Sequence, residues 1–313
     1  MSETKMKISI ICPIFNNSRS FPTLITEIRS QLETCSDRFE IILVDDRSSD
    51  DSWLKIGALA SQNENIKGIR LSRNFGQQLA VSAGIRHASG DIIIIMDGDL
   101  QNPPEAIPKM VERIESGKDI VYTVSKVRNN WGDEITSRLF WFVMNTILKV
   151  EIIPNQLMMK AFSRKFVDLY NGYEERIRIV AGITHDIGME YEVLEVINRK
   201  RPSGRGNYGF FKRFHLMLDV VITMTNRPLN YLINLSLFAV LISLGLGGYT
   251  LINYFLYTTV PKGYTTLIVI VSFFGSLTML VLGIIGRYLS NIYSEVRQRP
   301  TFIVQNKLNL GEA

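Results

Sequence analysis

The chain has few cysteines and few histidines. Its 313 residues include two cysteines, Cys12 and Cys35, whose spacing fits neither a zinc site nor a disulfide framework. Cys12 lies in the apolar run Ile8–Cys12, which favours a buried thiol in a strand. No catalytic or metal-binding role is predicted for the scattered histidines His87, His185 and His215. Neither disulfides nor a Cys/His metal centre is therefore expected to organise this protein.

The chain also lacks a basic stripe with interleaved aromatic residues. It carries 35 Lys and Arg against 30 Asp and Glu, a formal net charge of +5. A nucleic-acid-binding protein is expected to concentrate its basic residues on one face or along one helix. Here they gather on either side of two apolar segments, which favours contact with a membrane surface. We therefore predict no nucleic-acid partner.

Charge is absent from two long segments, Leu229–Tyr257 and Tyr264–Ile285. Each exceeds the roughly 20 residues that are needed to cross the hydrocarbon core of a bilayer. The polar connection between them is short enough only for a tight hairpin. We therefore predict two transmembrane helices, at about 229–257 and 264–287, within a membrane region at 229–289.

The basic residues predict the orientation of this hairpin. They are dense from Arg199 to Arg227 and recur from Arg287 to Arg299, whereas the connection carries only Lys262. The positive-inside rule places both flanks in the cytoplasm, and the N-terminal apolar run is too short for a signal peptide. We predict a multi-pass protein of the cell (inner) membrane, with a cytoplasmic domain at 1–228 and a cytoplasmic tail at 290–313.

Two amphipathic stretches precede the membrane region, at 131–150 and 208–225. Both are rich in large apolar side chains, which suit either a core helix or a helix lying in the membrane interface. For 131–150 the two interpretations are evenly balanced. The interface is favoured for 208–225, because that stretch leads directly into the membrane segment.

The first part of the chain alternates short apolar runs with helical patterns. The runs predict strands at 7–15, 39–44, 66–71, 91–96 and 119–124. Helical spacing of apolar residues predicts helices at Pro22–Leu32, Trp53–Ser61, Gln77–His87 and Ile107–Glu115, with Gly90 as a C-cap after the third. This alternation indicates an α/β fold with a doubly wound, mainly parallel sheet.

Polar residues follow the ends of four predicted strands. Ligands of such sheets bind at the carboxyl ends of the strands, so these segments are expected to meet at one edge. The segments are Phe15-Asn16-Asn17, Asp45-Asp46, Ser72-Arg73-Asn74 and Asp97-Gly98-Asp99.

Asp97 and Asp99 are the sharpest chemical signal. Two carboxylates one residue apart, just past a buried strand, can both reach one hard cation, and Gln101 is placed to add a carbonyl oxygen. Mg²⁺ or Mn²⁺ would take substrate phosphate oxygens at its other positions and offset the charge of a leaving diphosphate. The Asp45-Asp46 pair is suited to hydrogen bonds with the base and ribose of a nucleotide.

These motifs together resemble the family 2 glycosyltransferases of the GT-A fold. The motifs are Pro13-Ile-Phe-Asn16, Val44-Asp45-Asp46-x-Ser48-x-Asp50, Leu71-Ser72-Arg73-Asn74-Phe-Gly76 and Met96-Asp97-Gly-Asp99-Leu-Gln101-x-Pro103-Pro104. The segment Ile285–Pro300 resembles one group of that family. This group is the polyprenyl-phosphate glycosyltransferases, which include the dolichyl-phosphate mannose synthases and bacterial relatives with a C-terminal membrane hairpin. The match covers nearly the whole chain, in the family's order.

The resemblance implies an inverting, metal-dependent transfer from a nucleotide-sugar donor to a polyprenyl-phosphate lipid at the membrane. It implies Mg²⁺ or Mn²⁺ on Asp97, Asp99 and Gln101. It implies a nucleotide-sugar site made by Pro13, Phe15, Asn16, Asp45, Asp46, Arg73, Asp97 and Gly98. The candidates for the acceptor phosphate are Lys126, Arg128, Arg138 and Arg201, although membrane-surface charge explains Arg128 and Arg201 equally well. The resemblance also suggests a homo-oligomer.

A phosphate monoester is already ionised at neutral pH. Its oxygen therefore needs positioning and charge neutralisation more than a strong general base. Arginine suits this task because its fork can donate two parallel hydrogen bonds to a phosphate, which makes Arg138 a catalytic candidate. Asp99 is the candidate if a base is needed.

The chain departs from the family pattern at several positions. Asn17 stands where Glu is frequent, Arg47 where Gly is usual and Ser125 where Arg is common. The stretch Asn155–Lys160 stands where relatives often have an Asp-Phe-Arg-like stretch. These departures favour a sugar less common than plain glucose or mannose.

Two other functions are compatible with the sequence. The first is a glycosyltransferase that extends a lipid-linked saccharide. The second is a non-catalytic membrane scaffold, against which the intact Asp97, Asp99 and Gln101 argue. Metal-dependent turnover of a donor discriminates the scaffold from both enzymes.

Asp99→Ala is expected to abolish sugar transfer and leave membrane insertion intact, because the Asp97–Gln101 loop lies outside the predicted core. The measurement is turnover in detergent beside the yield from the membrane fraction. Near-normal turnover would contradict the assignment of Asp99 to the metal.

Overall fold

The computed structural model describes residues 6–126, 155–173, 187–197, 263–297 and 299–311, with a few isolated positions between these ranges. The chain divides into two compact units. The first comprises Met1–Phe142, Glu151–Asn207 and Pro300–Ala313, and the second comprises Val143–Val150 and Tyr208–Arg299.

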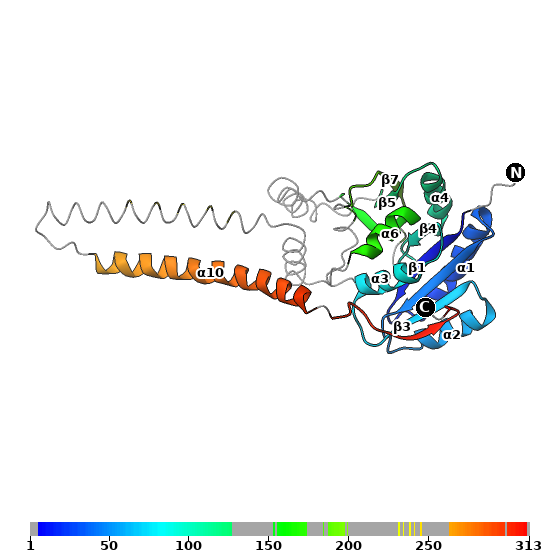
Figure 1. The fold of residues 1–313 in the computed structure, drawn as a ribbon, viewed down its shortest axis with the longest axis horizontal. Coiled ribbons are helices and arrows are strands. Elements are labelled where there is room, and N and C mark those ends of the chain that lie inside the picture. The colour runs from blue at the N-terminus through cyan, green and yellow to red at the C-terminus, as the bar shows by residue number, and fades with distance from the viewer. Residues whose placement is uncertain are drawn as a thin grey trace, which may run out of the picture. The chain divides into compact units, whose positions relative to one another are not determined.

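The first unit is built on a mixed sheet whose eight described strands have the order β7-β5-β6-β4-β1-β2-β3-β8 (Figure 1). The strands are β1 (Ile8–Ile14), β2 (Phe39–Asp45), β3 (Ile66–Leu71), β4 (Ile92–Ile95), β5 (Ile120–Ser125), β6 (Gln156–Ser163), β7 (Tyr191–Val196) and β8 (Val304–Leu308). β1 pairs in parallel with β2 and β4, β2 pairs in parallel with β3, and β5 pairs in parallel with β7. β6 runs antiparallel between β4 and β5, and β8 runs antiparallel along β3.

Helices cover both faces of this sheet. They are α1 (Phe21–Cys35), α2 (Ser52–Gln62), α3 (Gln77–His87), α4 (Ile107–Glu115), which follows the short 3₁₀ turn η1 (Pro104–Ala106), and α6 (Arg164–Gly172). Apolar side chains of α1, α2 and α4 pack in one buried cluster, and those of α3 and α6 pack in a second. Alternate residues of one strand enter different clusters: Ile92 and Ile94 lie in the first, Ile93 and Ile95 in the second. A strand buried on both faces needs an uninterrupted apolar run, which explains the four isoleucines of β4.

The structure confirms the predicted α/β fold. The five predicted strands and four predicted helices occur at the predicted places, with ends that differ by at most three residues. The sheet is less uniform than a simple parallel one, because the antiparallel β6 separates β5 from β4. The partly polar strands β6, β7 and β8 were not predicted.

Gly90 is not the C-cap of α3, contrary to the sequence analysis. The helix ends at His87 and Ala88 is its C-cap. A Cβ on Gly90 would lie 2.6 Å from Ser9 Oγ and 2.8 Å from the carbonyl oxygen of Lys7. Glycine is therefore required because the backbone passes close to β1, and not because a helix ends there.

The second unit contains α10 (Tyr264–Val296), which includes the second predicted transmembrane segment and continues past its predicted end. Its window Phe273–Ser290 has a mean hydropathy of 1.5, and only 6% of that window is buried. Among the described residues it is the one helix long and apolar enough to cross a membrane. The first predicted span at 229–257 and the amphipathic stretches at 131–150 and 208–225 lie wholly or largely outside the described residues.

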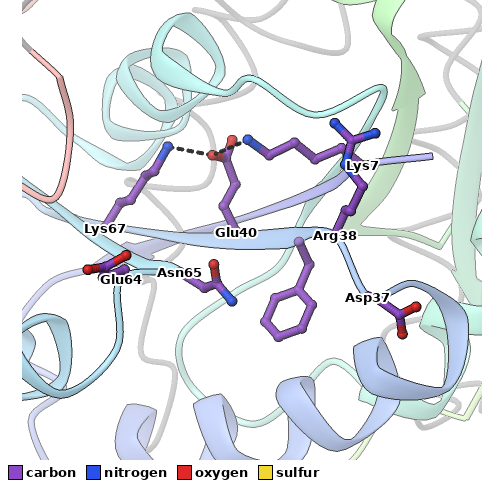
Figure 2. Close-up of a pocket in the computed structure, with 8 residues that line it drawn as sticks. Lys7, Asp37, Arg38, Glu40, Glu64, Asn65 and Lys67 are labelled. Atoms are coloured by element: carbon purple, nitrogen blue, oxygen red, sulfur yellow. Dashed lines mark hydrogen bonds and ion pairs between the residues drawn. The ribbon is translucent and has the colours of Figure 1, made fainter. Parts of the chain in front are cut away.

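A network around Glu40 joins the amino ends of three parallel strands. Figure 2 shows Lys7 and Lys67 reaching toward the Glu40 carboxylate in a hollow of about 300 Å³. Glu40 Oε2 lies 3.3 Å from Lys7 Nζ and forms a second ion pair with Lys67. Its Oε1 accepts hydrogen bonds from Ser9 Oγ at 2.6 Å and from the Ser89 amide at 2.7 Å. Glu40 is thus fully engaged in linking β1, β2, β3 and the turn before β4.

The environment of Glu40 links folding stability to pH. Burial alone would raise the pKa of this carboxyl group, but hydrogen bonds from Lys67, Ser89 and Ser9 outweigh burial and lower the pKa to about 2. A pKa below the ordinary value of 4.5 stabilises the folded state above pH 4.5. That contribution, roughly 3 kcal/mol, is lost as the pH falls through about 2.

Glu40→Gln should therefore lower the free energy of unfolding by roughly 3 kcal/mol at pH 7. The difference from the wild type should shrink as the pH falls from 4.5 toward 2, because Glu40 itself becomes protonated. Denaturant unfolding at several pH values measures both effects. Glu33→Gln is the control, since this exposed residue pairs only with Arg29 on the surface of α1 among the described contacts. Equal unfolding midpoints for Glu40→Gln and wild type at pH 7 would refute the role of this network.

Candidate active site at the carboxyl edge of the sheet

The loops after β1, β2 and β4 meet at the carboxyl edge of the sheet, as the sequence predicts. The Asn16 amide donates to Ser48 Oγ at 3.0 Å, and the Ser49 amide donates to Asn16 Oδ1 at 2.8 Å. Asn17 Nδ2 donates to the carbonyl oxygen of Gly98. Asn16 has a φ of 48°, in the left-handed region that asparagine tolerates better than most residues. The three loops therefore hold one another.

Gly98 has a steric role at this junction. A Cβ there would lie 2.5 Å from Ile14 Cδ1 and 3.2 Å from the carbonyl oxygen of Pro13. A side chain at position 98 would push the Asp97–Gln101 loop away from the end of β1. Pro13 and Gly98, both predicted to line the nucleotide-sugar site, take part in this close approach.

Asp45 and Asp46 are both buried but have different surroundings. Asp45 Oδ1 accepts a hydrogen bond from the Ser48 amide at 3.0 Å, and its Oδ2 forms an ion pair with Arg70 Nε at 3.1 Å, without the alignment of a hydrogen bond. Asp46 is 3% exposed. Its two oxygens accept from the amides of Phe75 and Gly76, at 2.7 and 2.8 Å.

The Asp46 carboxylate therefore ties the loop after β3 to the loop after β2. Burial raises the pKa of Asp46, the two amide hydrogen bonds counteract this, and the neighbouring charge of Asp45 raises it further. In the loop that Asp46 holds, the exposed Arg73 lies with its guanidinium carbon 4.2 Å from the centre of the Phe75 ring.

Asp97 is oriented by two amide side chains. Gln77 Nε2, at the start of α3, donates to Asp97 Oδ1, and Asn102 Nδ2 donates to Oδ2 at 3.1 Å. Asp99 Oδ1 accepts from the Gln101 amide at 3.1 Å, which curls the loop back on itself. The curl places Leu100 at a φ of 64°, which is unfavourable for a leucine. Gln77 and Asn102 did not emerge from the sequence analysis, although Asn102 lies only three residues beyond Asp99.

The donor groups of this loop fit Mg²⁺ or Mn²⁺. The carboxylates of Asp97 and Asp99, with the amide oxygen of Gln101 as a further candidate, are the hard oxygen ligands that these cations prefer. Among the described residues no group of three or more His, Cys, Asp or Glu is clustered as a metal site. Water and the oxygens of a bound substrate are further candidate ligands for a cation held here.

Lys160 is a buried cation beside this loop. It lies on β6, paired in register with Ile95 and Tyr122, and is 5% exposed. Its Nζ is 5.6 Å from the centre of the Tyr122 ring. Burial lowers the pKa of Lys160 to about 8, and the carboxylate of Asp97 opposes that shift. The stretch Asn155–Lys160 was predicted only to be unusual, with no role for Lys160. The available signal was a lysine flanked by the apolar and small residues of Leu157–Phe162.

Arg199 joins the metal-candidate loop to two helical segments. Its amide donates to the carbonyl oxygen of Gln101 at 3.0 Å, and its guanidinium pairs with Glu27 at 2.6 Å and with Glu105. The sequence analysis counted Arg199 among the cations flanking the membrane. The structure instead places its charge against two carboxylates of the first unit.

Of the remaining predicted site residues, the structure describes Phe15 and Lys126. Phe15 is 50% exposed at the end of β1, beside the Asn16–Ser48 contact. Lys126 is exposed directly after β5, and its amide donates to the carbonyl oxygen of Val196 at 3.0 Å. Arg128, Arg138 and Arg201 lie outside the described residues.

Comparison with known proteins decides the family. Residues 9–171 match the model of glycosyl transferase family 2. The chain is 30% identical over 304 residues to a bactoprenol glucosyl transferase of Shigella phage SfV, covering 96% of this chain and 99% of that protein. This chain is a family 2 glycosyltransferase.

One further relative agrees with this assignment, and a solved structure shares the fold. An uncharacterised glycosyltransferase of Synechocystis sp. is 29% identical over 303 residues, covering 96% of this chain and 95% of that protein. A crystal structure of glucosyl-3-phosphoglycerate synthase from Mycobacterium tuberculosis, with Mn²⁺, uridine diphosphate and phosphoglyceric acid, shares the fold. Its TM-score is 0.52 at 19% identity, over 71% of this chain and 78% of that one. The family 2 glycosyltransferase has the predicted GT-A fold.

Asn102→Leu tests whether Asp97 is held for a metal. This change keeps the branching and the number of heavy atoms of the side chain but removes the donor to Asp97 Oδ2, so the affinity for Mn²⁺ should fall about tenfold or more. Direct Mn²⁺ binding and the Mn²⁺ dependence of turnover are the measurements. Asn65→Leu, in the hollow at the opposite edge of the sheet, is the control. Unchanged Mn²⁺ binding in Asn102→Leu would rule out this positioning role.

Proposed function

We propose that this glycosyltransferase moves a sugar from a nucleotide-sugar donor to polyprenyl phosphate, with inversion and with a divalent metal, at the cytoplasmic face of a membrane. The observation that carries the proposal is the similarity to a bactoprenol glucosyl transferase over nearly the whole of both chains. That similarity extends past the family 2 domain into the region of α10. A lipid acceptor explains why a transferase domain is joined to an apolar helix whose side chains are mostly exposed.

The donor nucleotide is assigned to the loops after β1, β2 and β3. Phe15 offers an exposed ring for stacking against a base, and Asp45 and Asp46 lie at the carboxyl end of β2. Asn16 lies in the loop after β1, which Ser48 contacts, and Arg73 lies in the loop after β3, which Asp46 contacts through Phe75. The fold neighbour with uridine diphosphate and Mn²⁺, and a second structure of that synthase with uridine diphosphate and Mg²⁺, support this assignment by analogy.

Asp97, Asp99 and Gln101 are assigned to the metal, and Gly98 to the turn that brings them together. A bound Mg²⁺ or Mn²⁺ would neutralise charge that develops on the leaving diphosphate. The chain's own contribution is orientation: Gln77 and Asn102 hold Asp97, and the Gln101 amide holds Asp99. Because this orientation exists before substrate binds, it costs nothing at the moment of reaction.

The acceptor reacts as an ionised phosphate. One of its oxygens forms a bond to the anomeric carbon as the bond from that carbon to the diphosphate breaks, and attack from the opposite side inverts the anomeric centre. Lys126, Arg128, Arg138 and Arg201 are the proposed cations for this phosphate, with Arg138 and Asp99 as the catalytic candidates. Electrostatic positioning of this kind lowers the barrier without requiring a strong base.

The membrane arrangement is part of the same proposal. A hairpin at 229–257 and 264–287 would make the protein multi-pass in the inner membrane, with both flanking regions cytoplasmic. The product would then form on the side where nucleotide sugars are made. A homo-oligomer and a sugar other than plain glucose or mannose belong to the proposal as well, the latter because of the unusual stretch that ends at Lys160.

A transfer assay in detergent tests this proposal. Undecaprenyl phosphate is offered with a panel of labelled UDP-, GDP- and dTDP-sugars, in Mg²⁺, in Mn²⁺ and with a chelator. We expect a lipid-soluble product from one donor and its loss with the chelator. No product from any donor, with folded protein, would contradict the acceptor and favour a lipid-linked saccharide. A product that survives the chelator would contradict the metal.

A further inference from the structure

The C-terminal strand β8 lies beside the loops assigned to the donor nucleotide. It is separated from β3 by more than two hundred residues in sequence, yet it pairs with β3 at the edge of the sheet (Figure 1). Only residues 297–303 separate this strand from the end of α10. The function described so far assigns no role to the strand.

The strand is firmly attached at its end nearest the C-terminus. Asn309 Nδ2 donates to the carbonyl oxygens of Ala60 and Ile66, at 2.7 and 2.9 Å. Leu308 packs over Gly68, where a Cβ would lie 3.0 Å from Leu308 Cδ1. These contacts hold β8 against α2 and β3, so its other end has a defined position.

That other end contacts both donor loops. The Ser72 amide, at the start of the loop after β3, donates to the carbonyl oxygen of Ile303 at 2.9 Å. Arg47, in the loop after β2, donates through Nη1 to Gln305 Oε1. Asp46 already ties these two loops to each other through Phe75 and Gly76. β8 therefore adds a support to these two loops, beside their contact through Asp46 and the contact of Asn16 with Ser48.

The backbone at both ends of the Arg47–Gln305 contact is unusual. Arg70 pairs with Asn306 and Leu71 pairs with Val304, which leaves Gln305 as the extra residue of a β-bulge. Bulges redirect a side chain out of the regular pattern of the strand. Arg47 has a φ of 60°, an unfavourable conformation for arginine that persists only when its surroundings hold it. The contact to Gln305 is one such restraint.

We propose that β8 positions the donor-binding loops, with Arg47 and Gln305 as the positioning pair and the Ser72–Ile303 hydrogen bond as the second support. The inference rests on the proposed use of these loops for the nucleotide. A loop that adopts its binding-competent form only part of the time lowers the apparent affinity by that fraction. Removing one hydrogen bond that favours this form should weaken nucleotide binding about two- to tenfold.

Direct binding of uridine, guanosine and thymidine diphosphate, each with Mn²⁺, to the full chain in detergent tests the proposal. Gln305→Ala should weaken binding of the preferred nucleotide about two- to tenfold, while its melting temperature stays within a degree or two of the wild type. Arg47→Ala should do the same. The double variant should bind no more weakly than the weaker single variant, because both changes remove one contact. Asn306→Ala, an exposed neighbour on β8, is the control.

The outcomes separate this inference from the proposed function. Failure of the wild-type protein to bind any of the three nucleotides would overturn the proposed function. Binding by the wild type and equal binding by Gln305→Ala would overturn the positioning role and leave the function standing. Additive losses in the double variant, or a fall in melting temperature large enough to explain the weaker binding, would also overturn it. If Arg47→Ala fails to fold, nucleotide binding by Gln305→Ala alone still tests the positioning role.

Discussion

The parallel pairing of β1 with β2 and β4 is the constraint on which the candidate active site depends. It brings Ile14 level with Asp45, and Ile11 level with Ile95, so three strands end within a few residues of one another. Every polar segment of the site leaves the sheet at that edge. The contacts among these loops, such as the Asn16–Ser48 hydrogen bond, can form because the carboxyl ends of these strands lie side by side.

Buried carboxylates serve different purposes at the two edges of the sheet. At the amino edge, Glu40 is surrounded by two lysine ammonium groups and two serines, which makes it a structural anchor. At the carboxyl edge, Asp46 accepts two backbone amides and shapes a loop. The amides of Gln77 and Asn102 orient Asp97 without adding charge. Glu40, which pairs with lysines, thus stabilises the fold. Asp46 and Asp97, which accept hydrogen bonds from amides, shape the candidate active site.

The C-terminal strand of this family 2 glycosyltransferase belongs to the sheet of the first unit, although it follows α10 in the chain. The chain leaves the first unit, passes through the apolar helix α10 and returns to complete the same sheet. Around the start of β8, Ile303 and Gln305 contact the loops that we assign to the nucleotide. In the chain, only residues 297–303 lie between α10 and this strand.

The sequence by itself determined the elements whose signal is local. The four isoleucines of β4, the helical spacing in α4 and the order of the Asp45-Asp46 and Asp97-Gly-Asp99 motifs predicted the α/β fold, the family and the edge of the sheet where the site lies. Only the tertiary structure decided how β6, β7 and β8 pair, why Gly90 is a glycine and which side chains surround Asp97. Those strands are partly polar, and both the pairing that places Lys160 opposite Ile95 and the contact of Gln305 with Arg47 depend on register across the sheet. Periodicity along a chain carries no information about register between strands that are distant in sequence.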